Sequence, residues 1–291
     1  MRTSFTGRYS MRILVTGARG QLGHDVMKEL LSKKLIPIGV DREEMDITNK
    51  EDVHKYMDPL EVDAVIHCAA YTAVDQAEEE IELCRKINVE GTRYIAEVCK
   101  SKDIPMMYIS TDYVFDGKGS EPFLPDSPRN PVNFYGQAKY EGELVVEELL
   151  SKYFIVRISW VFGENGKNFV RTMLDLGKKL GKLTVVNDQF GSPTYTSDLS
   201  KLLVEMIQSK EYGTYHATNE GICSWFEFAT EIFKQAGLPV DVQPVDSSAF
   251  KTKAVRPLNS RMSKEKLVEK EFEKLPDWKD ALSRYLKVID Y

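Results

Sequence analysis

Cysteine is scarce in this chain, and neither cysteine nor histidine is clustered. Only four of the 291 residues are cysteines, at positions 68, 84, 99 and 223, and none has the Cys-x-x-Cys spacing. Zinc sites are built from clustered thiolates and imidazoles, so the spacing predicts no metal site. Few, scattered cysteines are typical of thiols that stay reduced, and we therefore expect a cytoplasmic protein.

Long apolar segments and excess basic charge are also missing. No apolar run approaches the length of about 18 residues that a membrane-spanning helix needs. The 39 Lys and Arg are outnumbered by 45 Asp and Glu, which gives a formal net charge of -6. A nucleic-acid-binding protein needs a basic face, so we expect neither a nucleic-acid nor a membrane partner. A small anionic ligand stays compatible, because a helix N-terminus can hold it.

Short apolar runs alternate with helical patterns through the first part of the chain. We expect strands at 13–15, 35–40, 64–68, 105–110 and 154–158, and helices at 22–31, 75–100 and 134–150. Strands that are apolar throughout and separated by helices indicate a parallel sheet covered on both faces. The sequence thus predicts an α/β fold, a Rossmann-like doubly wound parallel sheet with a smaller C-terminal substrate-binding region.

The pattern loosens after about residue 165. We expect helices at 168–179, 198–209, 225–236 and 277–286, and strands at 183–186 and near Tyr215. Residues 11–165 are predicted to form the main sheet domain, and residues 166–291 a smaller region with some segments returning to it. Residues 1–10 are polar, lack the apolar stretch of a signal peptide, and are interpreted as a tail or tag.

Three glycines, Gly17, Gly20 and Gly23, join the first predicted strand to the first helix. The first permits a tight turn, the second lets the backbone approach a pyrophosphate, and the third permits close packing of helix on sheet. The spacing departs by one residue from the dinucleotide fingerprint, and a glycine turn without a ligand is the alternative. The position between strand and helix favours a nicotinamide dinucleotide, with its phosphates at the helix N-terminus.

Asp41 ends the second predicted strand, about 20 residues beyond the turn, where an acid binds the adenosine ribose. This favours NADH as the cofactor. Arg42 beside it and Arg19 inside the turn offer partners for a 2′-phosphate, so NADPH stays open. Asp46 either caps the next helix or approaches the adenine.

Tyr135 and Lys139 are four residues apart and therefore share one helix face. An adjacent ammonium favours the phenolate, so we expect Lys139 to lower the pKa of Tyr135 from its reference value of about 10. The tyrosine would then protonate a carbonyl oxygen as hydride reaches the carbon. Thr111, at the end of the fourth predicted strand, is placed to bind the same oxygen, and Lys139 to bind the nicotinamide ribose.

Four longer segments carry a more specific resemblance: AAYTAVDQAE (69–78), STDYVFDG (110–117), RISWVF (157–162) and NDQFGSPT (187–194). With the Tyr-Lys pair they resemble the dTDP-4-dehydrorhamnose reductases, a group of the extended short-chain dehydrogenase/reductase family, over nearly the whole chain. The resemblance implies reduction of dTDP-4-dehydro-β-L-rhamnose to dTDP-L-rhamnose with NADH or NADPH. It makes 11–165 mainly an NAD(P)-binding domain and 166–291 mainly the substrate-binding region.

The resemblance also implies roles for single residues. Tyr135 would be the proton donor, Lys139 its partner and Thr111 the carbonyl binder. The expected cofactor contacts are Gly17, Gly20, Gln21, Leu22, Gly23, Asp41, Asp46, Ile47, Ala69, Ala70, Tyr71, Thr72 and Asn88, besides Tyr135 and Lys139. At Tyr71, where relatives often have His, the backbone rather than the side chain is the expected contact. Asn88 is expected to support the active-site tyrosine and lysine.

The substrate set is expected to be Thr111, Asp112, Tyr113, Trp160, Asn168 and Gln189. Trp160 offers a flat face for a sugar ring. Asn168 and Gln189 are neutral polar groups suited to a base or sugar, with turn and cap chemistry as the alternative. Lys167 and Arg171 are candidates to face a diphosphate.

Two other functions stay open. A nucleotide-sugar epimerase of the same family would give no net oxidation of the cofactor, and the regulatory subunit of methionine adenosyltransferase resembles the family without being an enzyme. Dehydratases carry an Asp-Glu pair after the active-site Thr, whereas Asp112 is followed here by Tyr113. A homodimer is possible.

Overall fold

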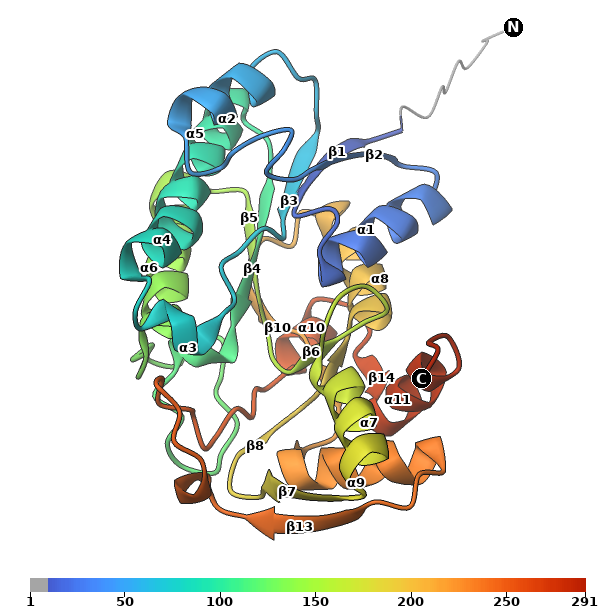
Figure 1. Cartoon of the computed structure of the whole chain (residues 1–291). Helices are drawn as coiled ribbons and strands as arrows, with labels where there is room; N and C mark the ends of the chain where they lie inside the picture. The colour runs from blue at the N-terminus through green and yellow to red at the C-terminus, as the bar shows by residue number, and fades with distance from the viewer. Residues whose placement is uncertain (1–9) are drawn as a thin grey trace, which may run out of the picture.

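A six-stranded parallel sheet forms the centre of the larger lobe (Figure 1). The structure, a computed structural model, describes residues 10–291, so the predicted tail lies outside the described residues except for Ser10. The sheet contains β1 (Arg12–Thr16), β2 (Ile36–Val40), β3 (Ala64–His67), β4 (Met106–Thr111), β5 (Tyr153–Ile158) and β10 (Gly213–His216). Their order is β10-β5-β4-β3-β1-β2, which confirms the doubly wound α/β prediction.

Helices bury both faces of this sheet. One layer contains α1 (Gln21–Ser32) and α8 (Thr196–Ile207), and the other contains α2 (Lys50–Met57), α5 (Thr92–Lys102) and α6 (Phe134–Leu149) (Figure 1). Along β1, Ile13 and Val15 belong to the first hydrophobic cluster and Leu14 to the second. Successive side chains of a strand face opposite sides, so strands buried on both sides read as continuous apolar runs.

The single helix predicted over 75–100 is wrong. The chain forms α3 (Val74–Ala77), α4 (Ile81–Arg85), a π-helical turn (Lys86–Gly91) and then α5. Within the widened turn, the Asn88 side chain accepts a hydrogen bond from the backbone N–H of Tyr71 at 2.9 Å and donates one to the Tyr71 carbonyl at 3.0 Å. This long-range contact breaks the regular helix, and it leaves no trace in the apolar spacing.

Two segments beyond residue 165 complete the larger lobe. Helix α8 covers the sheet beside α1, and β10 pairs with β5 in parallel, with Tyr215 opposite Val156. The helix is therefore the crossover that connects the last two strands. The boundary at residue 165 stays a prediction.

The smaller lobe has its own hydrophobic cluster, formed mainly by α7 (Phe169–Leu180), α9 (Trp225–Ala236) and α11 (Trp278–Leu286) (Figure 1). The parallel pair of β7 (Lys182–Val186) and β13 (Asp241–Val245) packs beside α9. The predicted helices are confirmed to within two residues. The short elements are β6 (Val161–Phe162), β8 (Phe190–Gly191), β9 (Thr194–Tyr195), β11 (Asn219–Glu220), β12 (Cys223–Ser224), β14 (Leu275–Asp277), α10 (Glu265–Glu269) and the 3-10 turns Asp112–Val114 and Ser247–Ala249.

A buried ionic network joins α6 to β4 and β5. Glu143 and Arg157 are 0% and 1% exposed, and the Nε and Nη2 atoms of Arg157 each donate to a Glu143 oxygen at 2.8 Å. Arg129 donates to the same carboxylate at 2.8 Å, and the Ser110 hydroxyl also donates to it. Removing one partner of such a pair leaves a buried charge without compensation.

We predict that Arg157→Met lowers the free energy of unfolding by about 3–5 kcal/mol, because Glu143 is then buried with too little compensating charge. The double variant Arg157→Met/Glu143→Leu should recover much of that loss. Urea denaturation followed by circular dichroism measures both. As a control, Arg93→Met removes an exposed pair with Glu148, whose side chains are 36% and 63% exposed, and should cost at most about 1 kcal/mol. Equal losses for the two single variants would contradict the prediction.

Candidate active site

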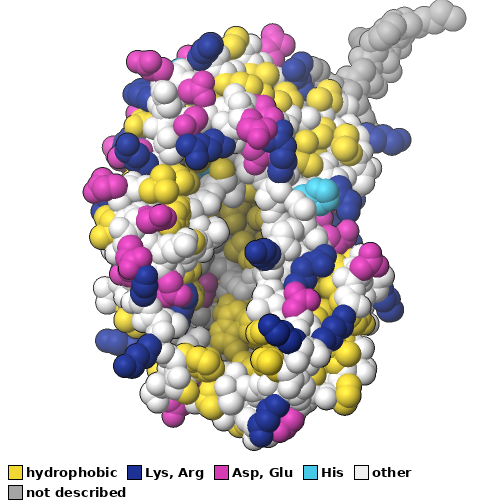
Figure 2. Space-filling view, in the orientation of Figure 1, with side chains coloured by type: hydrophobic (Ala, Val, Ile, Leu, Met, Phe, Trp, Pro, Cys, Tyr) yellow, Lys and Arg dark blue, Asp and Glu magenta, His cyan; other side chains and the backbone are white. Residues whose placement is uncertain are grey.

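A cleft opens where the chain order of the sheet reverses. The chain passes from β1 to β2 and returns to β3 on the other side of β1, and ligands bind at such switch points in α/β sheets. The cleft has a volume of about 730 Å³. Figure 2 shows it as a groove between the lobes with hydrophobic side chains in its depth. Its lining includes these predicted site residues: Gly17, Gly20, Gln21, Leu22, Asp41, Asp46, Ile47, Ala69, Ala70, Thr72, Thr111, Asp112, Tyr113, Tyr135, Lys139 and Trp160.

The glycine turn is packed too tightly for side chains. Gly17 has a φ of 65°, and a Cβ atom there would lie 2.8 Å from the backbone nitrogen of Ala69. A Cβ atom at Gly23, which is not on the cleft wall, would overlap the Gly17 carbonyl oxygen. Gly20 is the N-cap of α1 and provides no side-chain hydrogen bond. The first N–H groups of α1 are thus suited to a phosphate, and the turn fits a dinucleotide.

Acidic side chains surround the arginine of the turn. The Asp41 carboxylate accepts a hydrogen bond from the backbone N–H of Arg19 at 2.9 Å. The Arg19 guanidinium pairs with Glu44 and lies 3.5 Å from Glu43. Arg42 lines the cleft at this end. The site therefore offers an acid for a ribose hydroxyl. Arg42, which among the described residues has no ion pair of the kind that holds Arg19, is the better placed of the two arginines for a 2′-phosphate.

Asp46 does not cap α2, so that alternative is wrong. Its carboxylate accepts hydrogen bonds from the backbone N–H and the hydroxyl of Thr48, at 2.9 and 2.7 Å. The helix cap is Asn49, which accepts from the N–H groups of Glu51 and Asp52. Asp46 and Ile47 lie on the cleft wall, where contact with the adenine stays a prediction.

The predicted catalytic side chains meet at the middle of the cleft. Helix α6 begins after Asn133, which caps the N–H of Gly136 at 2.8 Å, and carries Tyr135 and Lys139 on one face. Thr111 is the last residue of β4, and it lines the cleft together with Tyr135. Lys139 is 2% exposed and donates from Nζ to the Ile109 carbonyl at 2.6 Å.

Burial dominates the electrostatics of this pair. It raises the pKa of Tyr135 above the ordinary value of 10.0, although the nearby Thr111 hydroxyl acts in the opposite direction. It also lowers the pKa of Lys139 to about 7, against the effect of the Glu143 carboxylate. The expectation that Lys139 lowers the tyrosine pKa is therefore wrong, because desolvation outweighs the ammonium, which is bound to a carbonyl. Tyr135 keeps its proton at neutral pH, as a proton donor must.

Asp112 is a buried acid beside Thr111. It is 4% exposed and accepts a hydrogen bond from the Thr111 hydroxyl at 3.0 Å. It accepts a second hydrogen bond from the Ser260 hydroxyl of the C-terminal region. Burial raises its pKa to about 6, while these two hydrogen bonds act in the opposite direction. Tyr113 packs edge-on against Tyr135, with ring centroids 5.6 Å apart.

Asn88 acts on the loop after β3 rather than on the catalytic pair. Its two hydrogen bonds fix the backbone of Tyr71, and it does not line the cleft. The Tyr71 hydroxyl donates a hydrogen bond to Glu80, and Tyr71 does not line the cleft. Ala70 and Thr72 on either side reach the wall. The structure thus corrects the expected place of Asn88, and the contact expected from the Tyr71 backbone stays a prediction.

Asn168 and Gln189 are not on the cleft wall, which corrects both substrate predictions. Asn168 caps α7 through the N–H of Arg171 and donates to the side chains of Gln21 and Tyr285 at 3.0 and 2.9 Å. Gln189 donates to the Ser247 hydroxyl at 2.9 Å. The alternative of turn and cap chemistry is the one the structure supports.

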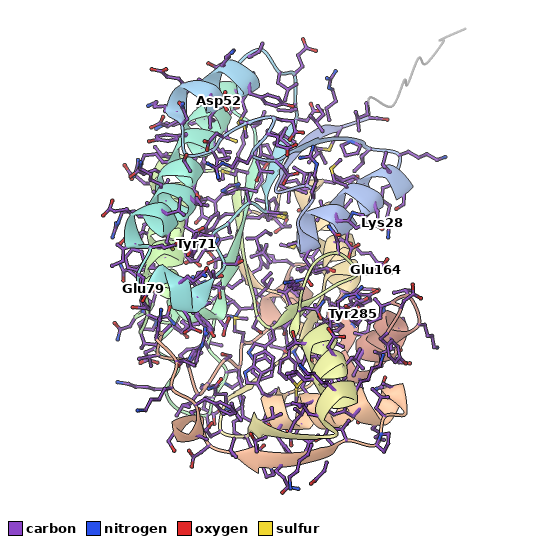
Figure 3. All side chains as sticks on the ribbon, in the orientation of Figure 1. Lys28, Asp52, Tyr71, Glu79, Glu164 and Tyr285 are labelled. Carbon is purple, nitrogen blue, oxygen red and sulfur yellow. The ribbon has the colours of Figure 1, made fainter. Side chains whose placement is uncertain are left out.

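The loop before α7 is bound to α1. The side chain of Glu164 lies 3.6 Å from Lys28 (Figure 3), and Arg171 donates to the Glu164 carbonyl at 3.0 Å. Arg171 is therefore engaged in holding this loop, and neither it nor Lys167 lines the cleft. The diphosphate contact considered for these two residues has no support in the structure.

Trp225 is the main cleft residue that the sequence analysis missed. It begins α9, and its indole stacks on that of Trp160 with centroids 3.7 Å apart. Both indoles line the cleft. The helix at 225–236 was predicted, but nothing in its local sequence indicates that its first residue meets the end of β5.

Within residues 10–291, no group of three His, Cys, Asp or Glu side chains is arranged to hold a metal ion. Over the same residues, every helix is too short or too polar to cross a bilayer.

The chain matches the family model described as the RmlD substrate binding domain over residues 11–290. It belongs to this family. A dTDP-4-dehydrorhamnose reductase of Aggregatibacter actinomycetemcomitans is 38% identical, over 93% of this chain and 97% of the relative. The spore coat polysaccharide biosynthesis protein SpsK of Bacillus subtilis is also 38% identical, over 95% and 97%. The resemblance inferred from the sequence motifs is confirmed.

A solved relative shares both the fold and much of the sequence. The dTDP-4-dehydrorhamnose reductase of Bacillus anthracis, solved in complex with NADP, superimposes with a TM-score of 0.94 at 42% identity. The match covers 97% of this chain and 100% of that chain. The RmlD family model and this relative both span the two lobes, so the cleft between them belongs to the shared fold.

We predict that Glu44→Gln improves the binding of NADPH relative to NADH by about two- to fivefold, the scale of an exposed ion pair. The substitution weakens the hold on Arg19, which is then available to a 2′-phosphate. Titration of nucleotide fluorescence gives both dissociation constants. Glu43→Gln is the matched control, because the Glu43 side chain is 85% exposed and lies farther from Arg19. The same change in the ratio for both variants would argue against a specific role of Glu44.

Proposed function

We propose that the protein reduces the 4-keto group of a dTDP-6-deoxy-hexulose, converting dTDP-4-dehydro-β-L-rhamnose to dTDP-L-rhamnose with NADH or NADPH. The observation that carries this proposal is the meeting of Thr111, Tyr135 and Lys139 in one cleft with the glycine turn. The names of the reductase relatives supply the substrate. The spore coat relative is consistent with a place in polysaccharide biosynthesis.

The cofactor would be held by the glycine turn and the N-terminus of α1, with its adenosine toward Asp41 and Ile47 and its nicotinamide beside Ala70 and Thr72. When bound, it supplies the hydride for the carbonyl carbon. The residues of this chain supply the remaining steps, which are to orient the sugar, to polarise its carbonyl and to provide the proton.

The proton comes from Tyr135. Its pKa is raised by burial, so the phenol holds its proton until negative charge develops on the substrate oxygen. Thr111 would bind that oxygen by turning its hydroxyl, which donates to Asp112 in this structure, toward the substrate, while the backbone N–H of Tyr113 holds the Thr111 oxygen in place. The O–H bond of Tyr135 breaks as the new O–H bond forms, and the C=O group becomes CH–OH. Lys139, when protonated, stabilises the phenolate that remains.

The proposal also covers the location of the enzyme, its partners and the roles of the two parts of the chain. We place it in the cytoplasm, with a nucleotide-sugar as its ligand, no nucleic-acid partner, and a homodimer as a possible assembly. Residues 11–165 would mainly bind the cofactor and residues 166–291 the substrate. The proposal includes no metal ion.

We predict that Tyr135→Phe lowers kcat by about a hundredfold or more, the scale of general acid catalysis. The cofactor and the nucleotide-sugar should bind nearly as before, since only a hydroxyl is lost. Oxidation of NADH and NADPH with a panel of 4-keto nucleotide-sugars measures turnover. Sugar isomerisation without net consumption of the cofactor would contradict the reductase and favour an epimerase. Unchanged turnover in the variant would remove Tyr135 from the mechanism.

We predict that kcat/KM is highest below about pH 7 and falls as the pH rises through that value. Lys139 is cationic below its pKa of about 7 and neutral above it, and only the cation stabilises the phenolate. A profile of kcat/KM measured from about pH 5.5 to about pH 9 gives the apparent pKa of the group that controls the reaction. Lys139→Met should be slow throughout and lack this alkaline limb. If the fall in kcat/KM at alkaline pH persists in Lys139→Met, the apparent pKa belongs to another group.

A further inference from the structure

Lys139 is a buried ammonium that is held mainly by uncharged groups. The residue is 2% exposed, and its Nζ donates to the Ile109 carbonyl at 2.6 Å. The acid of the next helical turn, Glu143, is paired with Arg157 and Arg129 instead. An ammonium that loses its water needs compensation from the protein, and one carbonyl supplies only part of it.

The ring of Tyr108 makes a second contact with this ammonium. The Nζ atom of Lys139 lies over the ring, 4.1 Å from its centroid. A cation is attracted by the negative face of an aromatic ring, and the attraction is strongest where water is excluded. Tyr108 is 1% exposed, so water is excluded here. The ring thus stabilises the positive charge while carrying no charge of its own.

The same helix that carries the lysine fixes the ring. Tyr108 precedes Ile109 in β4, and successive side chains of a strand face opposite sides, so the Tyr108 side chain lies on the α6 side of the sheet. Its hydroxyl donates to the Lys139 carbonyl at 3.3 Å. Gly142, the next glycine of α6, leaves the space that the hydroxyl occupies. Tyr108 therefore contacts both the backbone and the ammonium of Lys139.

The other titratable groups near the ammonium are neutral at pH 7, with the exception of Glu143. Burial raises the pKa of Cys68, after β3, to about 12 and that of Cys84, on α4, to about 11. Burial also lowers the pKa of His67, at the end of β3, to about 3, and the charge of Lys139 acts in the same direction. Thiols and an imidazole in these states add no charge to the site.

We propose that Tyr108 is a positioning residue of the reduction, whose ring keeps the Lys139 ammonium charged and in place on the catalytic face of α6. The inference rests on the reductase activity proposed above. Tyr108 is not on the cleft wall, so it acts through Lys139 and contacts neither the cofactor nor the substrate.

A ring suits this position better than a carboxylate. Lysine has three N–H donors and no acceptor, and the Ile109 carbonyl takes one of them. A carboxylate in place of the ring would accept a second donor and would add negative charge near the phenolate that forms on Tyr135. The ring holds the ammonium without that charge. It leaves donors for the cofactor ribose and for the phenolate.

Two substitutions separate the ring from the hydroxyl. Tyr108→Phe keeps the ring face and removes the hydrogen bond to the Lys139 carbonyl. Tyr108→Leu removes the ring and fills much of the same space, so that water does not take its place. Because the cation loses its attraction to the ring, we expect Tyr108→Leu to lower the pKa of Lys139 by about one unit, a tenfold change in proton affinity. In Tyr108→Phe the pKa should stay within about 0.3 units.

NMR of protein labelled at the lysine Cε atoms measures this pKa directly, with Lys139→Met to assign the signal, and requires no turnover. In the unaltered protein the signal should titrate near the Lys139 pKa of about 7. The kinetic profile should follow. In Tyr108→Leu, kcat/KM should fall about tenfold at about pH 8 and stay within about twofold at about pH 5.5, where both proteins carry the cation.

Tyr215→Leu is the matched control. Tyr215 is 0% exposed on β10 of the same sheet, and its ring lies under Lys266 instead, 4.8 Å from that Nζ atom. Its loss should leave the pKa of Lys139 unchanged. Circular dichroism and thermal unfolding identify a variant that fails to fold, in which case Tyr108→Met replaces the leucine.

The outcomes separate this inference from the proposed function. An unchanged pKa of Lys139 in Tyr108→Leu or Tyr108→Met would overturn the role of the ring, and an equal shift in Tyr108→Phe would assign the effect to the hydroxyl and overturn it as well. A shifted pKa in a protein that oxidises no cofactor with the keto-sugar would contradict the reductase alone.

Discussion

The contact that the site depends on is the close packing of α6 against β4. Two glycines make it possible, because a Cβ atom at Gly136 would overlap the Tyr113 carbonyl and one at Gly142 would overlap the Tyr108 hydroxyl. With the helix this close, Tyr135 packs edge-on against Tyr113 beside the end of β4, and Lys139 reaches the Ile109 carbonyl. The same closeness excludes water. Burial is therefore a consequence of the positioning, and it decides the charge of both Tyr135 and Lys139.

The electrostatics of the site follow from that burial. An exposed tyrosine beside a lysine would become more acidic, whereas here desolvation raises the pKa of Tyr135 and lowers that of Lys139. Glu143, one turn beyond Lys139 on α6, opposes the loss of the lysine proton and is itself neutralised by Arg157 and Arg129. One buried network thus connects the packing of α6, β4 and β5 to the protonation state of the lysine.

The C-terminal region also holds parts of the larger lobe next to the site. Arg256 forms an ion pair with Asp75 at 2.7 Å, and Asn133, the cap of α6, donates to the Val255 carbonyl at 2.8 Å. The C-terminal region thus holds the start of α6 and also contributes Trp225 to the wall of the cleft. This explains why the RmlD family model spans residues 11–290 rather than the sheet domain alone.

The local sequence determined strands β1 to β5 and helices α1 and α6 of the larger lobe, the glycine turn and the shared face of Tyr135 and Lys139. These features depend on side-chain periodicity and backbone geometry over a few residues, which are visible along the chain. The resemblance of longer motifs added the family and the substrate. Together they predicted most of the residues that line the cleft.

Tertiary structure alone decided the remaining features, because each depends on residues far apart in the chain. Asn88 widens a helix turn by binding Tyr71, β10 joins the sheet across α8, and Asn168 braces α1 instead of meeting a ligand. Trp225 reaches the cleft only because the two lobes meet there. The pKa of Tyr135 depends on how much water the assembled fold removes, and no spacing of residues in a sequence measures that quantity.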